Sequence, residues 1–302
     1  MNKINFGLII QDQKKKFKTK VKKDKKNILR SIQKEILVFF KKVYWKNFFS
    51  IKYILLTIAY FIKYKKKKIK KNSISILLPT RCRFFKFKRF MESLIKKTLH
   101  NYRVEILVFL DDDDPEKKLY VNAIDIIYSK KTNIKLFINK LETHPKRVNY
   151  LAKRCSGNLL LAMNDDNLII TQNWDVILDI ECSKIDITKP YAIWINSGNK
   201  YPYLHCHQPI INRAWYDRLG YVYSELFNFW YGDTWICDLS KRINKCLLLK
   251  NIIFNELNAQ AFPEEADLTY VKNISNNNME KDIDIWNLSL SERLEDSRKL
   301  LK

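Results

Sequence analysis

Short apolar runs, with one amphipathic segment between the first two, set the pattern of the chain from residue 74 to residue 163. The runs Ile74–Leu78, Val104–Leu110 and Asn158–Met163 are too short for typical helices, and each ends at a turn signal, which is typical of strands covered on both faces. In residues 84–99, apolar side chains recur every three or four positions and predict a one-sided helix. The order strand, helix, strand predicts a right-handed parallel crossover unit.

Polar residues follow each of these predicted strands. Thr80 follows the first strand, Asp111–Asp114 follow the second, and Asp165 and Asp166 follow the third. In open parallel sheets, ligands bind beyond the carboxyl ends of the strands. We therefore expect the three polar clusters to meet at one edge of the sheet and to form a binding site there.

The triplet Asn164-Asp165-Asp166 offers the oxygen ligands that a hard divalent cation, Mn²⁺ or Mg²⁺, takes from proteins. Of two adjacent carboxylates, one can hold the metal while the other binds a ribose or a metal-bound water. The triplet is equally consistent with an Asx turn or with the cap of a helix over residues 171–180. In the same way, Asp111–Asp114 before Pro115 also suits a solvated turn.

Positive charge is concentrated at one end of the chain. The formal net charge is +24, but residues 1–72 hold 23 lysines and arginines against three acidic residues, a net +20, so the remaining 230 residues are nearly neutral. The basicity therefore belongs to an appendage and not to the folded domain. Nucleic acid is an unlikely partner, because aromatic residues are not interleaved with the lysines of residues 14–26 as a stacking platform needs.

Residues 34–63 carry lysines on one helical face and large apolar side chains on the other. The longest stretch without charge is the ten residues Tyr53–Ile62, whereas a spanning helix needs about 20 apolar residues. This pattern favours a helix lying in an anionic membrane interface, with residues 65–71 adding attraction to an acidic leaflet. The alternatives are a helix packed on the domain and, less favoured, a single membrane span.

Cysteine usage indicates a reducing compartment. Six cysteines form no C-x-x-C pair, and the charged residues 11–26 do not fit a cleavable signal peptide. We expect free thiols and a cytoplasmic protein that is peripheral on the membrane face.

The pattern resembles the family-two glycosyltransferases with the GT-A fold, a nucleotide-diphospho-sugar-binding domain. The resemblance covers about residues 73–270 and rests on the order and spacing of its stretches. These are Ile74–Arg83, Glu105–Asp114, Asn149 with Gly157, Leu159–Asp166, Pro209–Gly220 and Tyr231–Asp238. It implies an α/β fold: a Rossmann-like GT-A single domain with a mostly parallel central sheet, preceded by the basic amphipathic helical segment 1–72. Residues 271–302 would form a polar linker and a C-terminal helix.

The resemblance also implies which residues bind the donor. Thr80, Arg81 and Arg83 would line the nucleotide. Asp111 or Asp112 would accept a hydrogen bond from its base, as the first acidic cluster of the family does.

Four further residues receive roles by the same resemblance. Asp165 would lie by the ribose or diphosphate, and Asp166 would ligate the metal. Arg147 would touch the diphosphate, although it lies one residue off the family pattern. Asp233 matches the catalytic base, which takes a proton from the acceptor hydroxyl. Because Asp233 precedes an apolar stretch, residues 235–247, that is expected to be helical, a pure N-cap role is the alternative.

The chain departs from the family in one respect. Many relatives carry a late histidine that completes the metal site, and the corresponding residues 255–260 contain none. Glu256 or Asn258 would have to substitute with oxygen, and His205 and His207 offer an alternative ligand pair. Because this histidine is missing, a weak or inactive enzyme is an open alternative.

The expected function is transfer of a sugar from a nucleotide-diphospho-sugar to a glycan or lipid-linked acceptor, by an inverting and metal-dependent reaction, in surface glycan or polysaccharide synthesis. One alternative is a sugar-phosphate nucleotidyltransferase, which would need a glycine-rich loop after the first strand, and residues 79–90 contain no glycine. The other is a catalytically degenerate protein that tethers to a membrane or to RNA.

Overall fold

The computed structural model describes residues 71–198, 205–257, 262, 265–267, 271 and 278–302. The helix expected over residues 34–63, and the rest of the basic appendage up to residue 70, lie outside these ranges and remain predictions. None of the helices in the described ranges is both long enough and apolar enough to cross a membrane.

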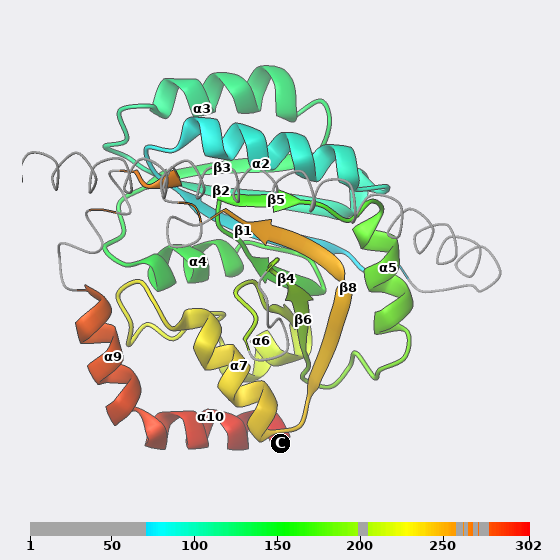
Figure 1. Cartoon of the computed structure of the whole chain (residues 1–302), viewed down its shortest axis with the longest axis vertical. Coiled ribbons are helices and arrows are strands. Elements are labelled where there is room, and N and C mark those ends of the chain that lie inside the picture. Colours follow the sequence, from blue (N-terminus) through cyan, green and yellow to red (C-terminus); the bar gives the residue numbers. More distant parts are fainter. Residues whose placement is uncertain (1–70, 199–204, 258–261, 263–264, 268–270, 272–277) are drawn as a thin grey trace, which may run out of the picture. The chain divides into compact units, whose positions relative to one another are not determined.

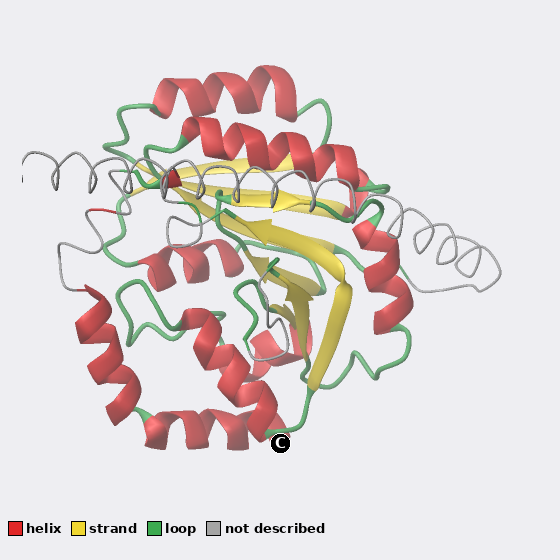
Figure 2. Ribbon diagram, in the orientation of Figure 1, coloured by secondary structure: helices red, strands yellow, loops and turns green. Residues whose placement is uncertain are grey.

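A twisted sheet of eight strands forms the centre of the domain, with helices on either side of it (Figure 2). The strand order is β3-β2-β1-β4-β7-β6-β8-β5. Their bounds are Ile74–Thr80 (β1), Val104–Asp111 (β2), Asn133–Asn139 (β3), Leu159–Ala162 (β4), Asn167–Ile169 (β5), Ala192–Asn196 (β6), Ile210–Asn212 (β7) and Cys246–Glu256 (β8). The three strands predicted from apolar runs are thus β1, β2 and β4.

The sheet is mostly parallel, as expected. Strands β1, β2, β3 and β4 pair in parallel, and β6 pairs in parallel with β8, while β7 and β5 run antiparallel to their neighbours. The register aligns Thr80 with Leu110 at the ends of β1 and β2. The polar residues that follow β1, β2 and β4 therefore lie at the same edge of the sheet.

Helices cover the sheet on both faces (Figure 1), with α2 and α3 on one face and α4 on the other. The helix bounds are Phe84–Lys97 (α2), Lys117–Ala123 (α3), His144–Ala152 (α4), Trp174–Cys182 (α5), Arg213–Leu219 (α6), Gly232–Arg242 (α7), Asn278–Leu288 (α9) and Leu290–Leu301 (α10). Helix α2 buries Phe87, Phe90, Met91 and Leu94, the apolar face predicted from their spacing. The helical stretch expected to run to residue 247 is too long: α7 ends at Arg242, where Asn244 turns the chain with a positive φ of 54°, and β8 begins at Cys246.

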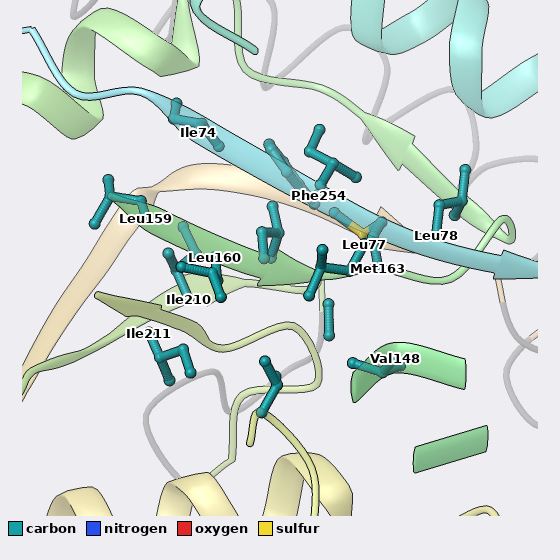
Figure 3. Close-up of a cluster of buried hydrophobic side chains, with 14 of the residues drawn as sticks. Ile74, Leu77, Leu78, Val148, Leu159, Leu160, Met163, Ile210, Ile211 and Phe254 are labelled. Carbon is teal, nitrogen blue, oxygen red and sulfur yellow. The ribbon is translucent and has the colours of Figure 1, made fainter. Parts of the chain in front are cut away.

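The core lies between the sheet and its helices, and Figure 3 shows its centre. Side chains of β1, β4 and β7, among them Leu77, Leu160 and Ile210, interlock there with Val148 of α4 and Phe254 of β8, and none is exposed. Burying a Leu, Ile, Val or Phe side chain contributes about 1.5 to 3 kcal/mol, so this layer fixes the strands whose ends carry the polar residues.

The C-terminal residues, expected to be a linker and one helix, contain two helices that pack on the domain. Helix α10 contacts α6 and α7. Asp282 of α9 is fully buried and accepts hydrogen bonds of 2.8 to 3.0 Å from the backbone N–H groups of Asn228, Phe229 and Trp230 and from the Asn228 side chain. This carboxylate fixes the loop directly before α7.

Asn72, which was expected to belong to the appendage, contacts the folded domain. Asn72 is 3% exposed, and both its backbone N–H and its side chain donate to Asp179 at 2.9 Å. Its carbonyl accepts from Arg103 at 2.8 Å, and Arg103 also binds Asp175 and Asp179 of α5. Residue 72 therefore belongs to the folded domain by its contacts.

Candidate functional site

Thr80 and Arg83 hold Asp165 in place at the carboxyl edge of the sheet. The Thr80 hydroxyl, at the end of β1, donates to Asp165 Oδ2 at 2.6 Å, and the Arg83 guanidinium donates to Asp165 Oδ1 at 3.2 Å. Tyr120 of α3 completes this group: its hydroxyl lies 3.1 Å from Thr80 Oγ1 and accepts from the Arg83 backbone N–H at 3.0 Å. The polar clusters after β1 and β4 thus meet, as the strand order predicted.

The acidic segment after β2 shapes the turn between β1 and α2. Cys82 adopts a positive φ of 51°, and its N–H donates to Asp114 Oδ2 at 2.7 Å. The Phe84 N–H, at the start of α2, donates to Glu116 at 2.9 Å. Asp111 and Asp114 are both 4% exposed, so this run of carboxylates is not simply a solvated turn.

Asp111 binds two of the predicted arginines. Its Oδ2 accepts from Arg81 at 2.8 Å and from Arg147 at 3.0 Å. Its Oδ1 is buried and accepts no hydrogen bond from the described residues. Arg81 also pairs with the exposed Asp113. Asp112 is exposed, and its backbone contacts Asn139 and Lys117. Asp111 therefore offers one free acceptor oxygen beside two cations.

Asp166 forms no ion pair with a cationic side chain among the described residues. It is 9% exposed, and among the described residues its side chain accepts one long hydrogen bond, 3.4 Å from Asn167 Nδ2. Burial and the charge of Asp165 raise the pKa of Asp166 to about 6. A hard divalent cation would stabilise its ionised form, and hard oxygen ligands are what such a cation takes, so the residues fit a metal at this position.

Asp233 lies in the first turn of α7, where both of its oxygens are engaged. Oδ1 accepts from the Thr234 N–H at 2.7 Å, and Oδ2 lies 2.9 Å from His205 Nε2. Burial acts to raise the pKa of Asp233, but the hydrogen bond and charge of His205 hold it below the ordinary value. The N-cap residue of α7 is Tyr231, in a left-handed conformation, so Asp233 supports the helix start without being its cap.

His144, the first residue of α4, links the two halves of the site. Its ring packs against Tyr223 and Phe229, and burial together with the charge of Arg147 lowers its pKa to about 4. The charges of Asp233 and Arg83 also act on this ring. The His144 N–H donates to the Asn228 carbonyl at 3.0 Å, so this residue joins α4, which carries Arg147, to the loop before α7, which carries Asp233.

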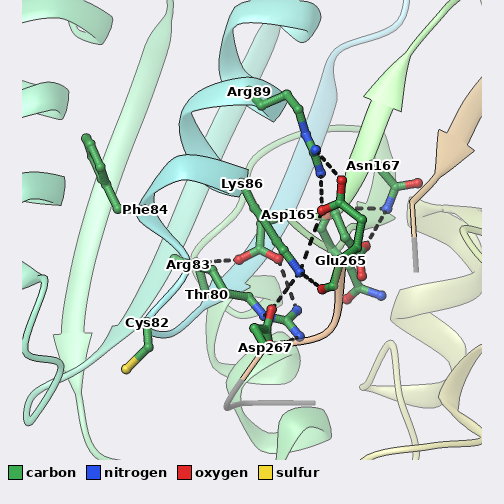
Figure 4. Close-up of polar contacts among 12 residues, drawn as sticks. Thr80, Cys82, Arg83, Phe84, Lys86, Arg89, Asp165, Asn167, Glu265 and Asp267 are labelled. Atoms are coloured by element: carbon green, nitrogen blue, oxygen red, sulfur yellow. Dashed lines mark hydrogen bonds and ion pairs between the residues drawn. The ribbon is translucent and has the colours of Figure 1, made fainter. Parts of the chain in front are cut away.

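Two acidic residues that were not predicted neutralise the basic face of α2 (Figure 4). Asp267 binds Arg83 at 2.9 Å and Lys86 at 2.6 Å, and Glu265 binds Arg89 with both oxygens. Arg83, Lys86 and Arg89 recur every three residues and so share one helical face, a signal that the sequence analysis did not use. Their acidic partners lie far along the chain, and no local pattern indicated them.

Of the two oxygen ligands suggested in place of the late histidine, the structure describes one. Asn258 lies outside the described residues. Glu256, at the end of β8, lies with its Oε2 3.1 Å from His207 Nδ1. The alternative pair of His205 and His207 does come together, with ring centroids 4.8 Å apart.

Comparison with solved structures confirms the fold. The mannosyltransferase PcManGT from Pyrobaculum calidifontis, in complex with GDP-Man and Mn²⁺, superposes with a TM-score of 0.51 and 12% identity, over 68% of this chain and 67% of that one. GalNAc-T7 with UDP, GalNAc and Mn²⁺ superposes with a TM-score of 0.51 and 16% identity, over 63% of this chain and 44% of that one. No protein-family model and no curated protein sequence matches the chain. The domain therefore has the GT-A type of fold that the sequence pattern predicted.

Proposed function

We propose that this protein is a glycosyltransferase that moves a sugar from a nucleotide-diphospho-sugar to an acceptor hydroxyl, with Mn²⁺ or Mg²⁺ at the donor diphosphate. The observation that carries the proposal is the carboxylate pair after β4. Asp165 is fixed by Thr80 and Arg83, whereas Asp166 has a raised pKa and forms no ion pair with the side chains that the structure describes. The two structures of the same fold, PcManGT and GalNAc-T7, contain a nucleotide or nucleotide sugar and Mn²⁺.

The donor nucleotide would bind at the ends of β1 and β2. The free Oδ1 of Asp111 suits a donor group of the base, and Arg81 and Arg147 would orient the Asp111 carboxylate through its other oxygen. Asp112 is exposed beside them as a second acceptor.

The diphosphate and ribose would bind beside β4. Thr80 and Arg83 hold Asp165 toward them, and Asp166 would ligate the metal. A divalent ion held by Asp166 would neutralise the charge of the departing diphosphate.

Asp233 is the proposed general base. As the acceptor oxygen bonds to the anomeric carbon, its proton passes to Asp233 Oδ2, and the bond from that carbon to the diphosphate oxygen breaks. Attack from the side opposite the diphosphate inverts the anomeric centre. The low pKa of Asp233 keeps it ionised at neutral pH, which is the form that accepts the proton.

The place of action follows from the basic appendage. With a net +20 in residues 1–72, we propose a peripheral protein on the cytoplasmic face of an anionic membrane, where glycan or lipid-linked acceptors for polysaccharide synthesis are found.

The turn after β1 argues against a nucleotidyltransferase. The residue with positive φ in this turn is Cys82, and its N–H is already bound to Asp114. A loop that wraps a triphosphate would need such N–H groups to face the phosphates.

A donor screen tests the proposal. UDP-, GDP- and TDP-sugars are incubated with the full-length protein and Mn²⁺, and release of nucleoside diphosphate is followed with and without simple glycan acceptors. We expect Mn²⁺-dependent release from one nucleotide class. Absence of both release and Mn²⁺-dependent binding for every donor would refute the proposal and favour the degenerate tethering protein.

A further inference from the structure

His205, His207 and Asp233 form a compact group of metal-binding side chains. Their ligand atoms, one from each residue, all lie within 4.8 Å of one another. In the part of the chain that the structure describes, no other set of three histidine, cysteine or acidic side chains comes together in this way. The group is only partly buried, so an ion can reach it from solvent.

The residue between the two histidines anchors this segment. Cys206 between them is fully buried, and its thiol donates to the carbonyl of Ile195 in β6. Cys206 is thereby fixed in the core, while the side chains of His205 and His207 on either side of it stay partly exposed, at 32% and 31%. Their rings then pack edge to face, with centroids 4.8 Å apart.

Both ends of the group are held by further contacts. Asp233 Oδ1 is fixed by the Thr234 N–H, which directs Oδ2 toward His205 at 2.9 Å. His207 Nδ1 lies 3.1 Å from Glu256 Oε2. A carboxylate that binds one ring nitrogen orients a histidine whose other nitrogen coordinates a metal, and this support is common in metal sites.

We propose that His205, His207 and Asp233 bind a transition-metal ion of the Zn²⁺ class, at a site separate from the oxygen site of Asp166. Two imidazoles and one carboxylate are a ligand set that Zn²⁺ and Co²⁺ accept and that Mg²⁺ does not favour. Ligand atoms about 2.0 to 2.2 Å from a tetrahedral ion lie roughly 3.4 Å apart. The 2.9 Å contact must open slightly and the wider ones close, which side-chain rotation can achieve. Water would fill the fourth coordination position of the ion.

The site has a direct chemical consequence. An ion on Asp233 Oδ2 occupies the oxygen that the proposed reaction uses as a base, so Zn²⁺ would inhibit transfer while Mn²⁺ at Asp166 supports it. The binding itself needs neither donor nor acceptor, and it can therefore be tested independently of the proposed function.

Cobalt provides the probe. Full-length protein freed of metal by a chelator is titrated with Co²⁺, and four-coordinate Co²⁺ bound by nitrogen and oxygen gives an intense visible absorption. We expect one equivalent to bind and Zn²⁺ to displace it. In NMR spectra of the unaltered protein, Zn²⁺ should shift the imidazole signals of His205 and His207 and leave those of His100 in place.

Matched variants locate the site. His207→Gln and His205→Gln should each weaken Co²⁺ binding by at least about tenfold. His100→Gln, which removes a histidine that binds Asp175 elsewhere, and Asp166→Ala should both retain it. The proposal is overturned if no stoichiometric Co²⁺ signal forms, if Zn²⁺ leaves the imidazole signals unchanged, or if all four variants bind Co²⁺ equally.

Discussion

At the scale of single residues, the two carboxylates after β4 differ although they are adjacent. Asp165 is paired with Arg83 and fixed by Thr80, whereas the Asp166 side chain accepts, from the residues in the described part of the chain, one hydrogen bond from Asn167. Like charges in a buried place raise the pKa of the less favoured group. Asp165 is therefore a positioned hydrogen-bond acceptor, whereas Asp166 is the carboxylate whose ionised form a cation would stabilise most.

Replacing Asp166 should abolish metal-dependent donor binding and stabilise the metal-free protein. Asp166→Asn removes the negative charge that would hold the metal, and it also removes the repulsion from Asp165. The free energy of unfolding of the metal-free variant at pH 7.5 should therefore be higher than that of the unaltered protein by on the order of 2 kcal/mol. Calorimetry with Mn²⁺ and nucleotide sugar measures the first effect and urea unfolding the second. Asp217→Asn, an exposed change on α6, is the control; unchanged Mn²⁺-dependent affinity in Asp166→Asn would remove the metal assignment.

Replacing Asp233 should separate catalysis from donor binding. Asp233→Asn keeps the side-chain shape, so donor affinity should persist, while transfer should fall by roughly 10²- to 10⁴-fold. Steady-state kinetics beside donor calorimetry provide the comparison. Asp238→Asn, on the same helix but paired with Arg242 and Arg293, should retain transfer. A variant that transfers normally but melts earlier would show that Asp233 only supports the helix start.

His144 should make the domain less stable in acid. Its pKa is about 4 in the folded protein against an ordinary 6.5, so the unfolded chain takes up the proton first as the pH falls. The stability it contributes is complete above pH 6.5 and is lost between pH 6.5 and 4. The full pKa shift corresponds to about 3 kcal/mol of folding stability. The expected loss is smaller than this, because the ring is only half-buried.

His144→Phe keeps an aromatic ring between Tyr223 and Phe229 and removes the titration. Urea unfolding midpoints of both proteins at pH 7.5 and pH 5 should show a smaller pH effect in the variant. An equal pH effect would mean that other groups cause the acid sensitivity.

At the scale of elements, the start of α7 depends on a helix that comes later in the chain. Four donors of the Asn228–Trp230 loop converge on Asp282 of α9. Removing such a buried acceptor leaves these donors unsatisfied. The position of Asp233 therefore depends on a buried residue of α9 that holds the preceding loop.

Asp282→Ala should lower the free energy of unfolding by about 3 to 5 kcal/mol. At a temperature where the variant is folded, transfer should fall more than donor affinity, because the loop before the base loosens. Asp284→Ala, an exposed change on the same helix, should alter stability by less than about 0.5 kcal/mol. If both variants unfold alike, Asp282 does not hold the loop.

Local sequence patterns predicted the strands and the helix face that depend on the residues next to one another in the sequence. The short apolar runs became β1, β2 and β4, and the spacing of Phe87, Phe90 and Met91 predicted the buried face of α2. The polar clusters could be brought together because parallel strands share one carboxyl edge. The end of α7 was missed, because the apolar residues after Arg242 suit the start of β8 as well as a helix.

Contacts between distant segments could not be predicted. Asp111 forms an ion pair with Arg147, and Asp267 forms ion pairs with Arg83 and Lys86. No pattern in the residues next to them in the sequence indicates these pairs. The same holds for Asp233 and His205, whose contact depends on how β6, β7 and α7 pack. Such contacts follow from tertiary packing and not from periodicity.

At the scale of the whole molecule, we expect the positive charge of the chain and the folding of its domain to be separable. Asn72 is fixed to α5, so it should stay with the domain in a truncated variant. A variant that lacks residues 1–70 should remain folded, because it keeps β1 and the contacts of Asn72, and should no longer bind anionic vesicles. Sedimentation with phosphatidylserine vesicles, with neutral vesicles as control, measures this.

Salt distinguishes the modes of attachment. Attraction through lysines should weaken from low to high salt, while the apolar face of residues 34–63 should retain part of the binding. A full-length protein that ignores anionic vesicles at every salt concentration would favour the helix packed on the domain. A requirement for detergent in extraction would favour a membrane span.

The dependence of the α7 start on Asp282 also bears on synthesis. A ribosome releases the chain from its N-terminus, so the strands of the sheet emerge before α9 does. Until α9 has emerged, the Asn228–Trp230 loop lacks its acceptor, and Asp233 has no fixed position. A nascent or prematurely terminated chain would thus have the proposed donor-binding edge formed and the proposed base unplaced, and transfer would require that α9 has emerged.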